Sequence, residues 1–240
     1  MLTLFCCQPI YKYRMNCYHT VKFKFSDQAW TWLQAFFGPI TADYQQHAPA
    51  PSALVKFKDQ DYEQFIKSSA WSELTQFLQT YAITDPYPQL FIYKKLQRPR
   101  EIVLGNPHID TTGGDGTELD VPIRFNILMS GDENTEMVWW DVNRNSPLVT
   151  NEKFTNPSGQ PVGRLQVVGH TPTERWQALG EPAVKSNSLS KKQEYASFVR
   201  TDILHALNWT GANPRLILSV RSSQPWPFNV GYETLPTFQC

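Results

Sequence analysis

The sequence predicts a mainly β protein, a barrel or jelly roll with helices on its flank. Beyond residue 88, many short stretches of strand character are separated by turn-forming residues, which is the pattern of all-β barrels and jelly rolls. Before residue 88, apolar residues recur at helical spacing instead. We therefore expect residues 1–88 to form a strand and a helical flank that pack on a β core of residues 89–240 and share one integrated domain with it.

The N-terminal flank begins with a strand over residues 18–25, where Val and Phe alternate with Lys, as in a half-buried strand. A helix is expected over 28–37, ended by Gly38-Pro39, and the Ala- and Pro-rich stretch 41–53 is expected to be a loop. Helical spacing of apolar residues from 59 to 81 predicts two more helices that cover one face of the sheet.

The core begins at residue 89. Its clearest strand covers residues 119–129, where every second residue is apolar. Further strands are expected at 90–96, 107–111, 135–142 and 163–169, and residues 195–202 lead into a strand that carries His205. Residues 143–161 predict a long surface loop, and 171–194 a polar connection with some helix at 189–194. The Gly-rich loop 112–117 is expected to be mobile and to act as a lid.

Composition excludes several classes of function. The formal net charge is zero, so the chain has no electrostatic footprint for nucleic acid or an anionic membrane. No stretch has the 18 or more apolar residues of a membrane span. The four cysteines lie near the ends, without metal-finger spacing, which favours a reducing, cytoplasmic setting. We expect a small-molecule or peptide substrate, and the sequence leaves the oligomeric state open.

His108 and Asp110 point to a metal site. In an extended strand, side chains two residues apart lie on the same face, so this imidazole and carboxylate can close on one ion. If His205 arrives from a neighbouring strand, the set is two histidines and one carboxylate on one side of the ion. The opposite side then stays open, as in non-haem Fe(II) oxygenases.

Residues 205–221 contain a strand with His205, a Gly-Ala-Asn-Pro turn and a strand headed by Arg215. Together with His108-Ile-Asp110, this segment resembles the 2-oxoglutarate/Fe(II)-dependent dioxygenases over about residues 88–223. The phytanoyl-CoA and aspartyl/asparaginyl β-hydroxylase branches look nearest, the second because of the Arg-Leu-Ile-Leu-Ser-Val run. The resemblance implies a double-stranded β-helix core, a jelly roll of the cupin-like kind.

The resemblance also implies roles for single residues. His108, Asp110 and His205 would hold Fe(II), leaving positions for 2-oxoglutarate and O₂. Arg215, ten residues after His205, would bind the distal carboxylate of 2-oxoglutarate, with Arg221 as second choice, because the planar guanidinium forms two charge-assisted bonds. Asn126 would help to bind the co-substrate. Arg124 shares its strand face, and a solvent-facing position is at least as compatible with the sequence for Arg124.

The sequence leaves several alternatives open, both for the ligands and for the function. His170 competes with His205 as the distal ligand, while His19 and His47 are expected to be solvated. The presence of Asp110 favours hydroxylation, because halogenating relatives carry a small residue there. The function implied is an Fe(II)- and 2-oxoglutarate-dependent hydroxylase. The alternatives are a cupin-like metal-binding isomerase or hydrolase that does not use 2-oxoglutarate, or a non-catalytic β-sandwich binding module.

Overall fold

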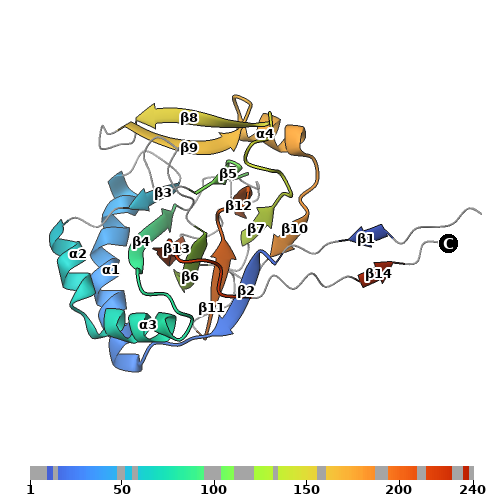
Figure 1. The fold of residues 1–240 in the computed structure, drawn as a ribbon. Helices are drawn as coiled ribbons and strands as arrows, with labels where there is room; N and C mark the ends of the chain where they lie inside the picture. The colour runs from blue at the N-terminus through green and yellow to red at the C-terminus, as the bar shows by residue number, and fades with distance from the viewer. Residues whose placement is uncertain are drawn as a thin grey trace, which may run out of the picture.

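Two antiparallel sheets form the body of the protein in the computed structural model (Figure 1). The structure describes residues 10–12, 16–47, 52–55, 59–94, 104–110, 122–131, 135–155, 161–186, 194–209, 215–228 and 235–237. The expected loop 112–117, the turn 211–214 and most of 189–194 lie outside these residues. Within the described part, no helix is long and apolar enough to cross a membrane.

Each of the two main sheets has six strands. Sheet I has the order β2 (Tyr18–Lys22), β11 (Tyr195–Arg200), β6 (Ile123–Ser130), β13 (Arg215–Ser222), β4 (Tyr87–Tyr93), β3 (Ser52–Val55). Sheet II has the order β10 (Val184–Ser186), β7 (Thr135–Trp139), β12 (His205–Trp209), β5 (His108–Ile109), β9 (Pro161–Val167), β8 (Val149–Thr155). A separate ribbon pairs β1 (Ile10–Lys12) with β14 (Leu235–Thr237).

Successive strands of the core change sheets. The chain passes from β5 in sheet II to β6 in sheet I and β7 in sheet II, and later from β11 to β12 to β13 in the same alternation. Side chains of both sheets meet in the interior: Leu207 of sheet II packs with Leu128 and Ile217 of sheet I. This arrangement is the double-stranded β-helix, and the predicted fold class is confirmed.

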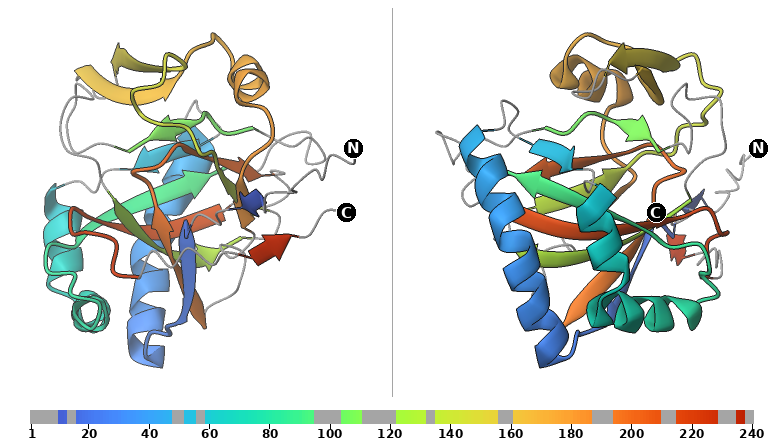
Figure 2. Two further views of the ribbon diagram at one scale, coloured as in Figure 1. Left: turned by 45° about the vertical axis from the view of Figure 1, so that its right-hand side comes forward. Right: turned by 90° about the vertical axis from the view of Figure 1, so that its left-hand side faces the viewer.

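Three helices cover the outer face of sheet I, as Figure 2 shows. They are α1 (Asp27–His47), α2 (Asp59–Ile66) and α3 (Ser69–Gln79). Ser68 caps α3 by accepting a hydrogen bond from the backbone N–H of Trp71, so the predicted break between two helices is confirmed. Leu33 and Phe37 of α1 are buried in the core cluster that the helices share with sheet I.

Helix α1 does not end at Gly38-Pro39, as the sequence predicts, but continues to His47. A proline inside a helix removes one backbone hydrogen bond. Here packing on both sides of Pro39 outweighs that loss: Phe37 lies in the core before it, while Ile40 and Tyr44 pack against the core after it. Tertiary burial thus overrides a local stop signal.

Two expected loops contain strands. The prediction of a loop over 41–53 is wrong, since α1 fills its first part and β3 its end. The prediction of a loop over 143–161 is wrong as well, because β8 pairs with β9 along its whole length. The seven residues of β8 are mostly polar, and a sheet-edge strand of this kind lacks the apolar alternation by which strands are recognised.

A fourth helix, α4 (Pro172–Leu179), lies in the stretch expected to be a polar connection. Thr171 is its N-cap and accepts a hydrogen bond from the N–H of Glu174, with Pro172 in the first turn. The ring of Trp176 packs edge-on against Trp140, with 4.8 Å between ring centroids. Helix α4 therefore covers the outer face of sheet II.

Candidate metal centre

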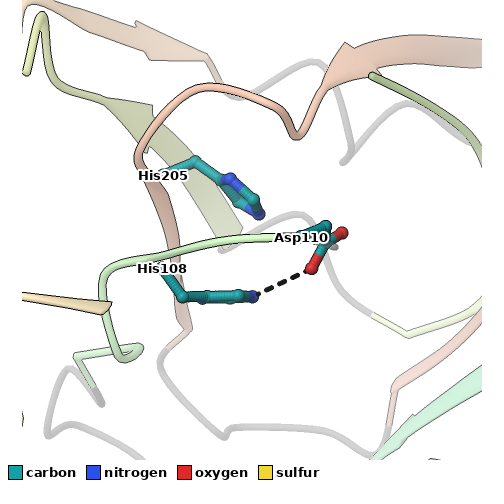
Figure 3. Close-up of side chains that lie close together, drawn as sticks. All are labelled: His108, Asp110 and His205. Atoms are coloured by element: carbon teal, nitrogen blue, oxygen red, sulfur yellow. Dashed lines mark ion pairs between the residues drawn. The ribbon is translucent and has the colours of Figure 1, made fainter. Parts of the chain in front are cut away.

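Side chains from two segments that are distant in sequence converge at one point of sheet II. His108 lies on β5 and His205 on β12, and the two residues are direct partners in the antiparallel ladder. Asp110 follows β5. The ligand atoms of His108, Asp110 and His205 all lie within 4.8 Å of one another (Figure 3). Nε2 of His108 is 3.4 Å from Oδ1 of Asp110.

Both imidazoles are oriented by backbone carbonyl groups. Nδ1 of His108 is 2.7 Å from the carbonyl oxygen of Asn106, and Nδ1 of His205 is 2.8 Å from that of Ile203. A carbonyl oxygen can only accept, so Nδ1 carries the proton in each ring. This leaves the Nε2 lone pair of each histidine available to a metal ion, which is the usual arrangement around histidine ligands.

Asp110 is held through both its backbone and its side chain. Its N–H donates to the carbonyl oxygen of Thr201 at 2.8 Å. Its Oδ2 accepts a hydrogen bond from Nε of Arg124, and Arg124 in turn donates through Nη1 to the side chain of Gln89. Only 11% of the Arg124 side chain and 13% of the Asp110 side chain are exposed. Arg124 is therefore part of the site, and the solvent-facing alternative for it is wrong.

The protonation states suit a divalent cation. Burial opposes charge on Asp110, yet the guanidinium of Arg124 holds the pKa of the carboxyl well below its usual value. Burial, followed by the neighbouring His108, lowers the pKa of His205 to about 3. At neutral pH the carboxylate is charged and His205 is neutral, and these are the forms that bind Fe(II) or Zn(II). The donor set therefore fits a metal ion.

The inner face of sheet I, which lies opposite this cluster, is organised in rows. Paired residues of an antiparallel sheet project from the same face, so the strand register places the side chains. A polar row crosses four strands and consists of Gln89, Ser219, Asn126 and Ser197. All four are buried. The hydroxyl groups of Ser197 and Ser219 have no hydrogen-bond partner within the described structure.

Arg215 and Arg221 lie on opposite sides of that polar row, at the two ends of β13. Arg215 is paired with Tyr93 and is only 1% exposed, with its guanidinium 5.9 Å from the Tyr93 ring. Arg221 is half-buried and directly opposite Arg124. The structure thus brings Arg221 to the level of Asp110 and places Arg215 deeper in the interior.

The competing histidines are elsewhere. His170 is exposed, and its backbone N–H donates to Glu174 at the start of α4. His19 is also exposed and stacks on Phe228, and the side chain of His47 lies outside the described residues. Of the three candidates with described side chains, only His205 lies beside His108 and Asp110.

Arg175 supports the centre from outside the sheet. It is 6% exposed and donates to the side-chain oxygens of Asn106 and Gln166, at 2.7 and 2.8 Å. Because the carbonyl group of Asn106 orients His108, helix α4 fixes the start of the ligand strand. The sequence held one signal for this helix, the Thr171-Pro-Thr-Glu174 cap, but no signal for the contact.

Comparisons with known proteins find solved structures of similar fold. No family model and no curated protein matches the chain. Among solved structures, EvdO2 from Micromonospora carbonacea var. aurantiaca has a TM-score of 0.50 at 10% identity, covering 92% of this chain and 94% of its own. At this level of identity the comparison shows a shared fold alone.

Two further structures were found at lower TM-scores. SnoK, described as a non-heme alpha ketoglutarate dependent carbocyclase from nogalamycin biosynthesis, has a TM-score of 0.49 at 13% identity, with 88% of this chain and 81% of that chain covered. EctD from S. alaskensis with 2-oxoglutarate and 5-hydroxyectoine has a TM-score of 0.47 at 13% identity, with 93% and 82% covered.

Proposed function

We propose that the protein is an Fe(II)- and 2-oxoglutarate-dependent oxygenase that hydroxylates its substrate. The observation that carries this proposal is the cluster of His108, Asp110 and His205, with ligand atoms within 4.8 Å of one another and both Nε2 atoms facing the cluster. Three protein ligands leave coordination positions for a co-substrate and O₂. When bound, Fe(II) and 2-oxoglutarate would supply the oxidative chemistry that turns a substrate C–H bond into C–OH.

The residues of the chain would hold the metal ion and keep its ligands oriented. His108 and His205 would donate Nε2 atoms, and Asp110 would donate Oδ1 while Arg124 keeps Oδ2. Because Arg124 and the backbone carbonyl groups already fix these three side chains, the ligands need little reorganisation when a metal ion binds. Such preorganisation favours a fixed coordination geometry.

For the co-substrate we propose Arg215 as the partner of the distal carboxylate, with Asn126 contributing from the polar row. Arg215 is fully buried, where a charge-assisted pair with a carboxylate is stronger than in water. The polar row lies between Arg215 and the level of Asp110, and its buried serine hydroxyl groups offer hydrogen bonds to a polar ligand. Arg221 is the alternative partner.

Anaerobic titration with Fe(II) and 2-oxoglutarate tests the proposal. We expect the visible metal-to-ligand charge-transfer band of a chelated 2-oxoglutarate complex, and we expect His108→Ala and Asp110→Ala to abolish Fe(II) binding. His170→Ala, which changes an exposed histidine, is the matched control and should behave like the parent. A band in His108→Ala equal to that of the parent would overturn the ligand assignment.

The same titration distinguishes the proposed oxygenase from the alternative functions. Iron binding without any effect of 2-oxoglutarate would favour the cupin-like isomerase or hydrolase. A purified protein that takes up no metal would favour the non-catalytic binding module. Within the oxygenases, the Arg-Leu-Ile-Leu-Ser-Val run on β13 favours the aspartyl/asparaginyl β-hydroxylase branch, which remains a proposal.

A further inference from the structure

Arg221 lies in a stack that reaches from the interior to the surface. On β13 it has Tyr87 of β4 on one side and Arg124 of β6 on the other. Its guanidinium lies 4.5 Å from the centroid of the Tyr87 ring, and the ring of Tyr62 on α2 stacks on Tyr87 with 5.6 Å between centroids. Tyr87 is 39% exposed, so the stack ends at the molecular surface.

Among the described residues, the two guanidinium groups of Arg124 and Arg221 have one carboxylate near them, that of Asp110. Arg124, its neighbour, is neutralised by Asp110. Among the described residues, no ion pair joins Arg221 to a carboxylate, and its one recorded partner is the face of the Tyr87 ring. Burial, and then the like charge of Arg124, lower the pKa of Arg221. A half-buried cation beside another cation is costly unless an anion joins it.

The distal carboxylate of the co-substrate is a poor candidate for that anion. Arg221 and Arg215 are six residues apart on one strand, which corresponds to about 20 Å between their backbones. The polar row and the apolar row containing Ile217 lie between them. A carboxylate that pairs with Arg215 therefore lies on the inner side of the centre, whereas Arg221 lies at the level of Asp110 and toward solvent.

We propose that Arg221 and the ring of Tyr87 form a substrate subsite that binds a carboxylate or phosphate group of the substrate beside the metal centre. The guanidinium provides the planar fork that such groups prefer, and the aromatic face holds the fork in place. The inference rests on the proposed function, since the group bound here is a substrate only if the centre is catalytic. It narrows the substrate to an anionic one.

The test measures binding of small probes to the anaerobic Fe(II)·2-oxoglutarate complex of the full chain, by calorimetry. The probes are benzoate, phenyl phosphate and the neutral benzamide. We expect at least one anion to bind about tenfold more tightly than benzamide, as a charge-assisted pair requires. Arg221→Gln should remove this preference and Arg221→Lys should keep part of it. Lys185→Gln, which removes an exposed surface charge, is the control and should keep the preference.

The outcomes separate this subsite from the proposed function. Equal binding of all three probes to the parent, or a preference that survives in Arg221→Gln, overturns the subsite. So does a tenfold weaker affinity of Arg221→Gln for 2-oxoglutarate itself, because Arg221 would then be the co-substrate's partner. If 2-oxoglutarate produces no charge-transfer band, the proposed function fails, and the same titrations of the Co(II)-loaded protein decide the anion site alone. Comparing benzoate with phenyl phosphate identifies the preferred anion.

Discussion

Arg124 donates to the oxygen of Asp110 that does not face His108. Oδ2 of Asp110 accepts from Nε of Arg124, while Oδ1 lies 3.4 Å from Nε2 of His108. With Oδ2 occupied in this way, the carboxylate offers one oxygen to a metal ion rather than two. The same ion pair supplies the counter-charge of Asp110 when no metal is bound.

We expect Arg124→Gln to destabilise the metal-free protein by about 2–4 kcal/mol, because it leaves a largely buried carboxylate without a counter-ion. Saturating Co(II) should recover most of that loss, since the ion then provides the positive charge. Urea unfolding with and without Co(II) measures both values. Arg200→Gln, which breaks the comparable pair with Asp202, is the control and should lose the same stability in both conditions. An equal loss for Arg124→Gln in both conditions would argue against this role.

Arg215→Ala should weaken the affinity for 2-oxoglutarate by at least about tenfold, because one partner of a charge-assisted pair is lost. Fe(II) affinity should change little, and Arg215→Lys should recover only part of the loss, since an ammonium cannot form the fork. Titration of the charge-transfer band measures the affinities for both Fe(II) and 2-oxoglutarate. If Arg221→Ala has the large effect and Arg215→Ala a small one, the two roles are exchanged. If neither variant matters, 2-oxoglutarate is not the co-substrate.

Gly105→Ala should weaken both folding and metal binding. A Cβ at this position would lie 2.2 Å from the backbone oxygen of Leu207 on β12, so the ligand strand and the His205 strand would have to separate. We expect a lower melting temperature and weaker Co(II) binding. Gly38→Ala is the control, because a Cβ there meets nothing within 4 Å and alanine favours the helix. Unchanged Co(II) affinity in Gly105→Ala would show that the strands tolerate the shift.

His205 should make the metal-free protein sensitive to acid. Its pKa is about 3 in the folded state, against an ordinary value of 6.5, so below pH 6.5 the unfolded chain takes up a proton that the folded protein excludes. Stability should therefore fall as the pH drops from 6.5 toward 3, by about 2 kcal/mol at pH 5 from this residue. Urea unfolding in EDTA should show a shallower pH dependence for His205→Gln than for the parent. His170→Gln should retain the parental slope.

Features that depend on a local sequence pattern could be predicted from the sequence. The spacing of His108 and Asp110 places both side chains on one face whatever the rest of the chain does, and apolar alternation identified the strand that became β6. The position of Arg215 at the head of a strand could also be predicted, and β13 begins there. These features depend on strand geometry, which a few consecutive residues determine.

Features that depend on tertiary contacts could not be predicted in this way. Whether Arg124 faces the interior or solvent depends on which side of β6 the helices cover. The continuation of α1 through Pro39 depends on packing against sheet I. Arg175 is four residues from the Thr171 cap, but its contact with Asn106 joins segments far apart in the sequence. No local pattern reports such a contact.

The pairing of His108 with His205 has a consequence for the order of folding. The two strands β5 and β12 are distant in sequence, and the carbonyl groups that hold Asp110 and His205 come from Thr201 and Ile203, just before β12. A chain that has not yet folded this late segment into place lacks one ligand and the backbone support of another. Metal capture should therefore require this segment to be in place, and a bound ion would stabilise the completed fold over every form in which β12 is not docked.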